Sequence, residues 1–334
     1  MNVKQARLFT VDPKNYSENV QVTKTLTIRS ASGSPADTVI LGNININADD
    51  VTINGFTVNG RVSLSGVESC AIKDNIVNSD LYEGIWLSES SGNNTLDSNV
   101  ASYNVKVGIY MTSGCDNNMI TGNTAKDNTQ RGIYLEGANN NNLAGNMVIN
   151  NGRGKYGDGG LFILRCSNNL FYNNYLDNTM NIGYYDGDNN RWNITKKSGT
   201  NICGRDLYLG GNYWSDYGGN DTDGDGLGDT EIPYTGRKIT DGGDYHPLVE
   251  AEFALTITSY TPESTVYDTE GAIRTFDLTT NQQANISWQI DENEEQTNKN
   301  VEISPYTADA RIGKSSISAI ASNQNGTVIQ TWIW

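Results

Sequence analysis

The tetrapeptide Gly-Ile-Trp-Leu at residues 84–87 returns as Gly-Ile-Tyr-Met at 108–111, as Gly-Ile-Tyr-Leu at 132–135 and as Gly-Leu-Phe-Ile at 160–163. The steps between these copies are 24, 24 and 28 residues. Asparagines keep the same step, in one series of Asn75, Asn99, Asn123, Asn146 and Asn174 and a second of Asn94, Asn118, Asn142 and Asn169. Because independent features share one period, each period builds one coil of a solenoid.

The repeat predicts a right-handed parallel β-helix over residues 1–210, in which each strand pairs with the equivalent strand one coil away. Side chains alternate along a strand, so one parity of each repeat faces the interior. The apolar inward columns are Ile85, Ile109, Ile133 and Leu161; Leu87, Met111, Leu135 and Ile163; Leu96, Ile120, Ala144 and Phe171; and Ala101, Ala125, Val148 and Leu176. We expect the asparagines to stack at the turns as ladders, with their amides hydrogen-bonded along the axis.

Composition agrees with an all-β protein, since 35 glycines and frequent asparagines suit short strands joined by tight turns. The chain carries 39 acidic and 23 basic side chains, which gives a formal net charge of −16. We therefore expect no nucleic-acid partner, because phosphate binding needs concentrated Lys and Arg. Divalent cations are the partners that this charge favours.

The compartment is not decided by the residues alone. No apolar run approaches the roughly 18 residues of a membrane span, and residues 1–10 lack the layout of a secretion signal. Either a signal is missing from this chain or the protein is cytosolic. The four cysteines, Cys70, Cys115, Cys166 and Cys203, are too scattered to form a disulfide framework.

The pattern changes after residue 252. Residues 254–258, 274–278, 285–290, 314–320 and 328–334 alternate in polarity without the 24-residue period. Five such strands in about 80 residues predict an immunoglobulin-like β-sandwich over 253–334. Trp288 is the candidate for its buried central tryptophan, although the usual disulfide is absent. Residues 211–252 form a junction between the two domains.

The coil pattern, followed by Gly210-Gly-Asn-Tyr-Trp-Ser-Asp-Tyr-Gly-Gly, resembles the NosD-like, carbohydrate-binding and sugar-hydrolase (CASH) β-helix family. The C-terminal part, with Ser259-Tyr-Thr-Pro and Asp268-Thr-Glu-Gly, resembles the Ig/PKD-like modules of cell-surface proteins in methanogenic archaea. These resemblances imply a β-helix fold and an extracellular, cell-surface location. The NosD resemblance also implies copper, but the chain departs from that role because it has a single histidine, His246, and scattered methionines.

The segment Asp221-Thr-Asp-Gly-Asp-Gly-Leu-Gly-Asp is similar to an EF-hand-type calcium loop, with acidic residues at positions 1, 3, 5 and 9 and glycine at position 6. The predicted calcium ligands are the carboxylates of Asp221, Asp223, Asp225 and Asp229 and the carbonyl of Leu227. Position 12 is Ile232, so Asp216, Glu231, Asp241 or Asp244 is expected to complete the set. The alternative is a flexible acidic turn.

An aromatic residue stands between the inward residues of each coil, and the parity argument places it on the outer face. These residues are Trp86, Tyr110, Tyr134, Phe162 and Tyr185. Stacked at one-coil spacing, they would form an exposed stripe that binds a polysaccharide. Two other interpretations stay open, namely a self-stabilising ladder and a surface that a loop, a cap or another molecule covers.

Catalytic residues are only weakly indicated. The 28-residue coil contains an insertion, and Asp158, Asp186 and Asp188 lie in sequence near Arg153, Lys155 and Arg165. Lyases and hydrolases with this fold use carboxylate pairs or calcium with a basic residue, but no spacing here demonstrates a pair. Asp and Gly in an insertion are also typical of a plain loop.

The sequence therefore predicts a non-enzymatic extracellular protein, a calcium-stiffened β-helix that presents a face to a polysaccharide, a cell-surface glycan or a protein. Self-association is a further possibility. One alternative is a polysaccharide lyase or glycoside hydrolase that acts on acidic glycans. The other is a purely architectural component of a fibre or surface-layer lattice.

Overall fold

The structure is a computed structural model that describes residues 7–152, 159–204, 208–250, 255–263, 265–323 and 326–334. The chain divides into two compact units, Met1–Ala251 and Glu252–Trp334. The described residues form β-strands and no helix, so they include no helix that could cross a membrane.

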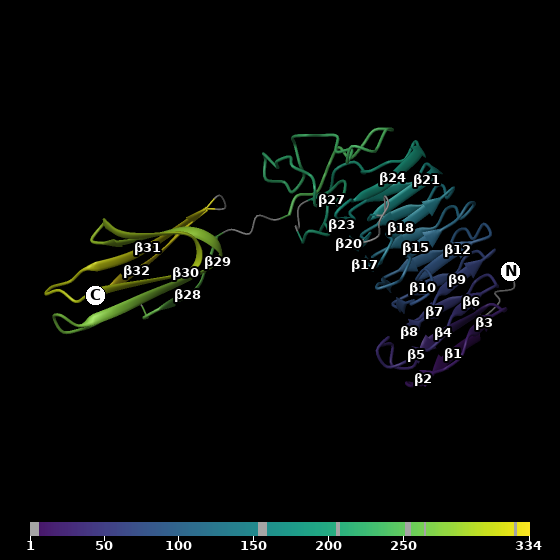
Figure 1. The fold of residues 1–334 in the computed structure, drawn as a ribbon, viewed down its shortest axis with the longest axis horizontal. Helices are drawn as coiled ribbons and strands as arrows, with labels where there is room; N and C mark the ends of the chain where they lie inside the picture. Colours follow the sequence, from purple (N-terminus) through teal and green to yellow (C-terminus); the bar gives the residue numbers. More distant parts are fainter. Residues whose placement is uncertain (1–6, 153–158, 205–207, 251–254, 264, 324–325) are drawn as a thin grey trace. The chain divides into compact units, whose positions relative to one another are not determined.

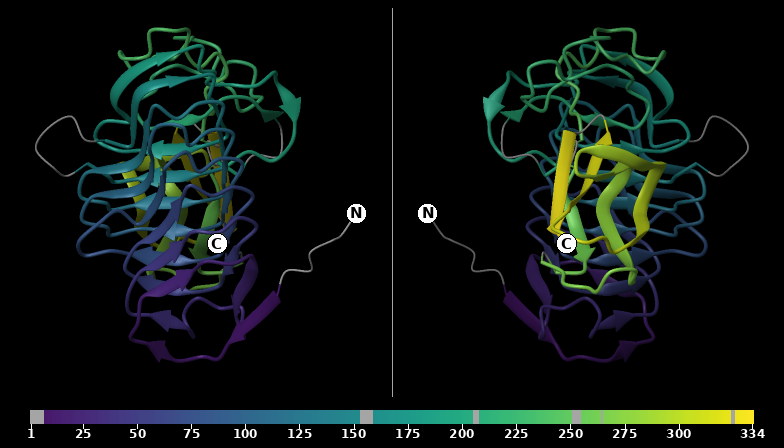
Figure 2. Two further views of the ribbon diagram at one scale, coloured as in Figure 1. Left: turned by 90° about the vertical axis from the view of Figure 1, so that its right-hand side faces the viewer. Right: turned by 90° about the vertical axis from the view of Figure 1, so that its left-hand side faces the viewer.

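The first unit is a parallel β-helix whose coils stack from the purple end to the green end in Figure 1, and Figure 2 shows the stack from two further sides. The first sheet contains β1 (Arg7–Val11), β4 (Leu26–Ser30), β7 (Thr52–Asn54), β10 (Ala71–Lys73), β13 (Thr95–Asp97), β16 (Met119–Thr121), β19 (Asn142–Ala144) and β22 (Leu170–Tyr172). The second sheet contains β2 (Asn15–Tyr16), β5 (Val39–Ile40), β8 (Thr57–Asn59), β11 (Ile76–Asn78), β14 (Val100–Ala101), β17 (Thr124–Lys126), β20 (Met147–Ile149), β23 (Tyr175–Asp177) and β27 (Tyr213–Trp214). The third sheet contains β3 (Val20–Val22), β6 (Ile44–Ile46), β9 (Val62–Ser65), β12 (Ile85–Ser88), β15 (Val107–Met111), β18 (Arg131–Glu136), β21 (Leu161–Ser167) and β24 (Ile182–Asp188).

The core of the β-helix consists of the inward columns of these sheets. On β12, β15, β18 and β21, Ile85, Ile109, Ile133 and Leu161 pair in register and are at most 2% exposed. Burying each such side chain contributes about 1.5–3 kcal/mol to folding. The predicted β-helix is therefore confirmed.

One predicted column is wrong by one residue, at a coil that is one residue shorter than the coil before it. Ile120 pairs with Leu143, and Leu143 pairs with Phe171, so Leu143 holds the inward position predicted for Ala144. The asparagine series likewise passes through Asn141 instead of Asn142. A shift of one residue exchanges the two faces of a strand, which is why a step of 23 residues defeats a 24-residue prediction.

Three asparagine ladders run along the axis. In each, the backbone N–H of one asparagine donates to the side-chain Oδ1 of the next, which lies one coil further on at most steps. The first ladder consists of Asn75, Asn99, Asn123, Asn146, Asn174 and Asn212, and the second of Asn94, Asn118, Asn141, Asn169 and Asn190. The third, which the sequence did not reveal, consists of Asn104, Asn128, Asn151, Asn178 and Asn181.

All three ladders end on an aspartate of the segment 211–250, which we call the C-terminal cap. The pairs of last asparagine and carboxylate are Asn212–Asp244 (2.7 Å), Asn190–Asp241 (3.0 Å) and Asn181–Asp216 (2.6 Å). Each carboxylate also accepts a hydrogen bond from an aromatic side chain, from Trp214 Nε1 to Asp244, from Tyr185 OH to Asp241 and from Tyr234 OH to Asp216. An ionised carboxylate only accepts hydrogen bonds, so it satisfies the donors that the last coil presents.

Asp244 is fully buried in the C-terminal cap. Its Oδ1 accepts the His246 backbone N–H at 3.0 Å and would lie 1.8 Å from a Cβ added to Gly211, so only glycine fits beneath it. Burial raises the pKa of Asp244 to about 6, although the N–H donors of Trp214, Asn212 and His246 act to lower it.

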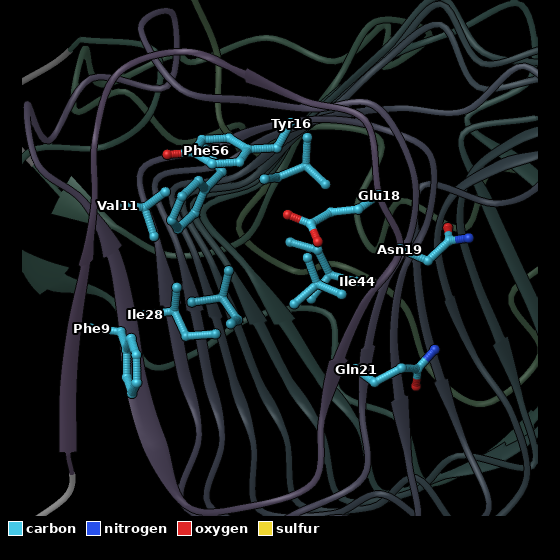
Figure 3. Close-up of a pocket in the computed structure, with 12 residues that line it drawn as sticks. Phe9, Val11, Tyr16, Glu18, Asn19, Gln21, Ile28, Ile44 and Phe56 are labelled. Atoms are coloured by element: carbon cyan, nitrogen blue, oxygen red, sulfur yellow. The ribbon is translucent and has the colours of Figure 1, made fainter.

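The N-terminal end of the β-helix is open among the described residues. Strands β1, β2 and β3 are the outer strands of their sheets. Val11, Ile28, Ile44 and Phe56 point into a cavity of about 410 Å³ at this end (Figure 3). We call this the N-terminal mouth.

The second unit is an antiparallel sheet of β28 (Ile257–Thr261), β29 (Ile273–Ile290), β30 (Asn293–Asp309), β31 (Ser316–Asn323) and β32 (Gly326–Ile333). Strand β29 is long enough to pair with β28 near its start and with β31 near its end. The sheet surrounds a core in which Trp288, Phe276 and Trp332 are fully buried. This arrangement is consistent with the predicted small β-sandwich, while its immunoglobulin-like topology stays a prediction.

Candidate functional site

The structure builds a row of aromatic rings on the outward face of the third sheet. Trp86, Tyr110, Tyr134 and Phe162 occupy the same register on β12, β15, β18 and β21. The rings of Tyr110 and Tyr134 stack with centroids 4.5 Å apart, and Phe162 meets Tyr134 edge-on at 4.9 Å. These separations match the strand spacing of the sheet, so the coil period itself positions the rings.

The fifth member of the row is Tyr184, and the place predicted for Tyr185 is wrong. Tyr184 pairs with Phe162 and stacks on it at 5.1 Å. Gly183 adds one residue where the register of β24 shifts, so Tyr185 falls on the opposite parity beside Ile163. We call Trp86, Tyr110, Tyr134, Phe162 and Tyr184 the aromatic row.

Two arginines pack on the rings of the aromatic row. The Arg61 guanidinium lies 4.3 Å from the Trp86 ring, and that of Arg131 lies 3.9 Å from Phe162 and 4.6 Å from Tyr134. Such contacts stabilise a half-exposed surface by about 0.5–1 kcal/mol each. The row is thus partly covered by its own cations, which supports the interpretation as a self-stabilising ladder as well as that of a binding surface.

Glu136 connects the tyrosines of the row. Its Oε2 accepts hydrogen bonds from Tyr110 OH at 2.6 Å and from Tyr134 OH at 3.1 Å, and its Oε1 pairs with Arg165 at 3.1 Å. Burial, followed by the charge of Glu136, raises the pKa of Tyr134 to about 12. Tyr134 is 9% exposed, its neighbours Tyr110 and Phe162 are half-buried, and Tyr184 is 43% exposed, so Tyr184 is the most accessible ring of the row.

The sequence missed the polar partners of the row. Arg61 and Arg131 stand just before the inward residues of their coils, and Glu136 follows β18's inward Leu135. A search for charges that flank the repeated tetrapeptide would have found Arg131 and Glu136, whereas Arg61 lies one coil before its first copy. The sequence could not show that the arginines fold back over the rings.

The catalytic candidates do not form a described carboxylate pair. Asp158, Arg153 and Lys155 lie outside the described residues. Asp186 and Asp188 are exposed on β24, and Arg165 pairs with Glu136.

The acidic loop brings together Asp221, Asp223 and Asp225, whose donor oxygens lie within 4.8 Å of one another. The loop is wound tightly, because Asp221 Oδ1 accepts the N–H of Gly224 at 2.8 Å and Asp221 Oδ2 accepts that of Gly226 at 2.8 Å. Three carboxylates this close repel one another, and a cation relieves that repulsion.

The other predicted ligands are placed differently. Asp229 Oδ2 accepts hydrogen bonds from the N–H (2.7 Å) and Oγ1 (2.6 Å) of Thr222, which lowers the pKa of Asp229. The Leu227 N–H donates to Asp225 Oδ1, and Lys196 pairs with Asp225 Oδ2. Of Asp216, Glu231, Asp241 and Asp244, one of which was expected to complete the set, the three aspartates accept hydrogen bonds from the ladders instead.

Comparison with known proteins identifies the family. The profile of the family described as periplasmic copper-binding protein (NosD) matches residues 7–219. The chain belongs to the NosD family. No curated protein sequence matches this NosD chain significantly.

Solved structures resemble the NosD chain at low sequence identity. ORF18 of Geobacillus virus E2 is 15% identical, with a TM-score of 0.45, and the match covers 56% of this chain and 44% of that one. The Azotobacter vinelandii mannuronan C-5 epimerase AlgE4 A-module is 12% identical, with a TM-score of 0.35 and coverage of 55% and 72%. A PL6 alginate lyase in complex with a trisaccharide is 13% identical, with a TM-score of 0.32 and coverage of 60% and 57%.

The donors that the structure describes do not fit a copper site. Copper in proteins favours thiolate, thioether and imidazole ligands, whereas the described cluster of three His, Cys, Asp or Glu side chains consists of carboxylates. Cys70, Cys115 and Cys166 are buried in the core of the β-helix, and burial raises the pKa of Cys70 to about 11. His246, whose pKa burial lowers, is the one histidine of the chain. We therefore propose no role for copper in this chain.

Proposed function

We propose that this NosD-family chain is a non-enzymatic extracellular scaffold that binds a glycan on the outward face of the third sheet. The aromatic row carries this proposal, because it offers rings at a regular spacing with arginines and carboxylates at their edges. Aromatic faces pack on the apolar faces of sugars while hydroxyl groups bond to neighbouring polar side chains. The periplasmic description of the family agrees with a location outside the cytoplasm.

The carboxylates beside the row support binding over catalysis. Glu83 is shared by Arg61 and Lys106, each at 3.3 Å, and Glu136 accepts hydrogen bonds from two tyrosines. A glycoside hydrolase needs one carboxylic acid and one carboxylate on either side of the scissile bond. Groups that are already held by cations and hydroxyls suit the positioning of rings better than proton transfer.

The acidic loop is proposed to hold calcium as a structural ion. Asp221, Asp223 and Asp225 supply carboxylate oxygens, which are the ligands that calcium prefers, with the Leu227 carbonyl and Asp229 as the further ligands that the loop pattern predicts. The loop lies within the C-terminal cap and is joined to the end of that segment, since Gly228 N–H donates to the Pro247 carbonyl at 2.8 Å. Bound calcium would therefore stiffen the end of the β-helix.

The glycan proposal is tested with a panel of immobilised neutral and acidic polysaccharides. The sharpest variant is Tyr184→Ala, because this exposed ring can be removed with little loss of core packing, and Trp86→Ala combined with Tyr110→Ala should abolish binding. Tyr267→Ala, which removes an 88% exposed tyrosine from the second unit, is the matched control. Binding that the row variants leave unchanged would contradict the proposal, and release of reducing or unsaturated ends would overturn its non-enzymatic part.

The calcium proposal is tested by calorimetric titration with calcium and with magnesium. Wild type should bind calcium and melt at a higher temperature with it, whereas Asp223→Asn should do neither. Asp186→Asn removes an exposed acid elsewhere and serves as the control. Equal calcium binding by wild type and Asp223→Asn would exclude the loop as the site.

A further inference from the structure

Exposed apolar side chains gather on two successive turns that lead from the second sheet to the third. Leu81 (69% exposed) and Tyr82 (40%) lie in the turn 79–84, and Tyr103 (67%) and Val105 (41%) lie in the turn 102–106. The turns are adjacent, because Val105 N–H donates to the Ser79 carbonyl at 3.0 Å. Exposed apolar groups concentrated in one place mark an interaction site more often than scattered ones do.

Tyr103 occupies a left-handed position of the coil at which the fold does not require a tyrosine. Its φ of 60° is left-handed, and among the described residues it is the one aromatic side chain with a positive φ. The equivalent positions of the next two coils, which make the same backbone hydrogen bond to the following coil, are Asp127 (φ 55°) and Asn150 (φ 54°). Asp and Asn tolerate this conformation far better than tyrosine does. A bulky exposed residue at a strained position points to function.

The two turns are continuous with the aromatic row. The Arg61 guanidinium lies 4.9 Å from the Tyr82 ring and 4.3 Å from the Trp86 ring, so it is shared between them. Arg61 and Lys106 both pair with Glu83 at 3.3 Å. Glu83 is thus shared by two cations, and the exposed Asp80 adds a second carboxylate in the same turn. The Lys106 side chain is 42% exposed, so its ammonium is the cation that a ligand can reach directly.

We propose that Tyr82, Tyr103 and Lys106 are the specificity-determining end of the glycan surface and that the glycan they select is anionic. The two tyrosines pack against sugar rings, and the Lys106 ammonium pairs with a sugar carboxylate. This inference rests on the proposed glycan function. It adds the charge of the ligand and the residues that recognise that charge and the sugar rings.

The first test is Tyr103→Asn, which replaces the strained residue with the type found two coils further on. The melting temperature should rise by about 2 °C as the strain is relieved, while binding of polygalacturonate should weaken about two- to tenfold. A gain in stability with a loss in binding is the signature of a residue kept for its ligand. Stronger or unchanged binding by Tyr103→Asn would overturn the assignment of Tyr103.

The second test uses polygalacturonate and its methyl ester, two probes that share a backbone and differ in charge. Wild type should bind polygalacturonate more tightly than the ester, and Lys106→Gln should remove most of this preference. Lys73→Gln is the matched control, because Lys73 is 41% exposed and pairs with Asp97 on the first sheet. Equal affinity of wild type for both probes would overturn the anionic assignment.

The proposed function and the further inference fail in different ways. If wild type binds no polysaccharide, the proposed function is wrong and the inference is wrong with it. If row variants abolish binding while Tyr103→Asn and Lys106→Gln leave it intact, the glycan function stands and the inference is wrong. In that case the exposed turns serve another partner.

Discussion

The two ends of the β-helix are finished in opposite ways. At the C-terminal end, three aspartates accept the last hydrogen bonds of three asparagine ladders, and Trp192, Trp214 and Tyr234 pack over the final coil. At the N-terminal end, the described residues leave an apolar mouth of about 410 Å³ bordered by the outer strands of three sheets. A solenoid extends until its donors and its core are terminated, and the described residues include such a termination at the C-terminal end.

The ladders differ between the ends as well. They begin where the backbone N–H groups of Phe56, Cys70 and Ser79 donate to the first asparagine side chains. Nearer the N-terminus the direction reverses, since Asn43 N–H donates back to Asn19 Oδ1 at 2.8 Å. Side-chain ladders therefore hold the C-terminal coils together over a longer distance, and we expect stability to be concentrated there.

The largest expected effect comes from removing a ladder terminator. Asp244→Ala should destabilise the β-helix by about 3–5 kcal/mol, because the N–H groups of Asn212, Trp214 and His246 lose their acceptor in a buried site. Urea denaturation measures the loss. Asp186→Ala, which removes an exposed carboxylate, should stay within about 0.5 kcal/mol of wild type. If the two variants were equally stable, the hydrogen bonds to Asp244 would not stabilise the C-terminal end of the β-helix.

The next largest effect is the difference in stability loss between replacing an asparagine of the C-terminal ladders and replacing one near the N-terminal end. Asn146→Ala should cost about 2–4 kcal/mol, because Asn146 is buried and accepts both the N–H (3.0 Å) and the Nδ2 (3.1 Å) of Asn123. Asn19→Ala should cost less than about 1 kcal/mol, because Asn19 is exposed and its amide accepts from Asn43 N–H where water can replace it. If urea denaturation gave the same loss of unfolding free energy for both variants, stability would not be concentrated in the C-terminal coils.

The sequence correctly predicted the residues whose position depends on a constant coil length. It misplaced residues where the length of a coil changes. Ile85, Ile109, Ile133 and Leu161 were assigned correctly because a constant step preserves parity. Ala144 and Tyr185 were misplaced where one coil is shorter and another contains an added residue, since each change exchanges the two faces.

The aspartates that end the three asparagine ladders could not be predicted from the repeat. Asp216, Asp241 and Asp244 are brought to three ladder ends by the folding of the C-terminal cap, in which Tyr234 and Asp244 pair through their backbones. Their sequence neighbours suggested calcium ligands instead. Only the three-dimensional path of residues 211–250 shows that each of these carboxylates faces an asparagine.

The pH dependence of stability sharpens the contrast at the closed end. The pKa of Asp244 is raised from 3.8 to about 6 in the folded state, so the folded protein holds this proton more tightly than the unfolded chain does. This contribution is full below pH 3.8 and is lost as the pH rises through 6, a change on the order of 2–3 kcal/mol. Wild type should lose this stability relative to Asp244→Asn between about pH 4 and pH 7, measured by urea denaturation.

Other titrating groups do not obscure this comparison, because both chains carry them. His246, whose pKa is lowered by burial and then by Lys196, is present in wild type and in Asp244→Asn alike. The difference between the two chains therefore isolates Asp244. A difference that grows in the opposite direction would mean that the N–H donors around the carboxylate outweigh its burial.

The smallest effect is expected at the open end. Phe9 is 57% exposed on the outer strand β1, so Phe9→Ser should change the free energy of unfolding by less than about 0.5 kcal/mol. The same change should reduce self-association in light scattering, because an exposed apolar edge strand is a template for pairing with another chain. Thr10→Ser, at an exposed position on the same strand, is the control. If Phe9→Ser destabilised the fold as much as Asn146→Ala does, the N-terminal coils would be as stable as the C-terminal ones. That result would contradict the proposal that the ladders concentrate stability in the C-terminal coils.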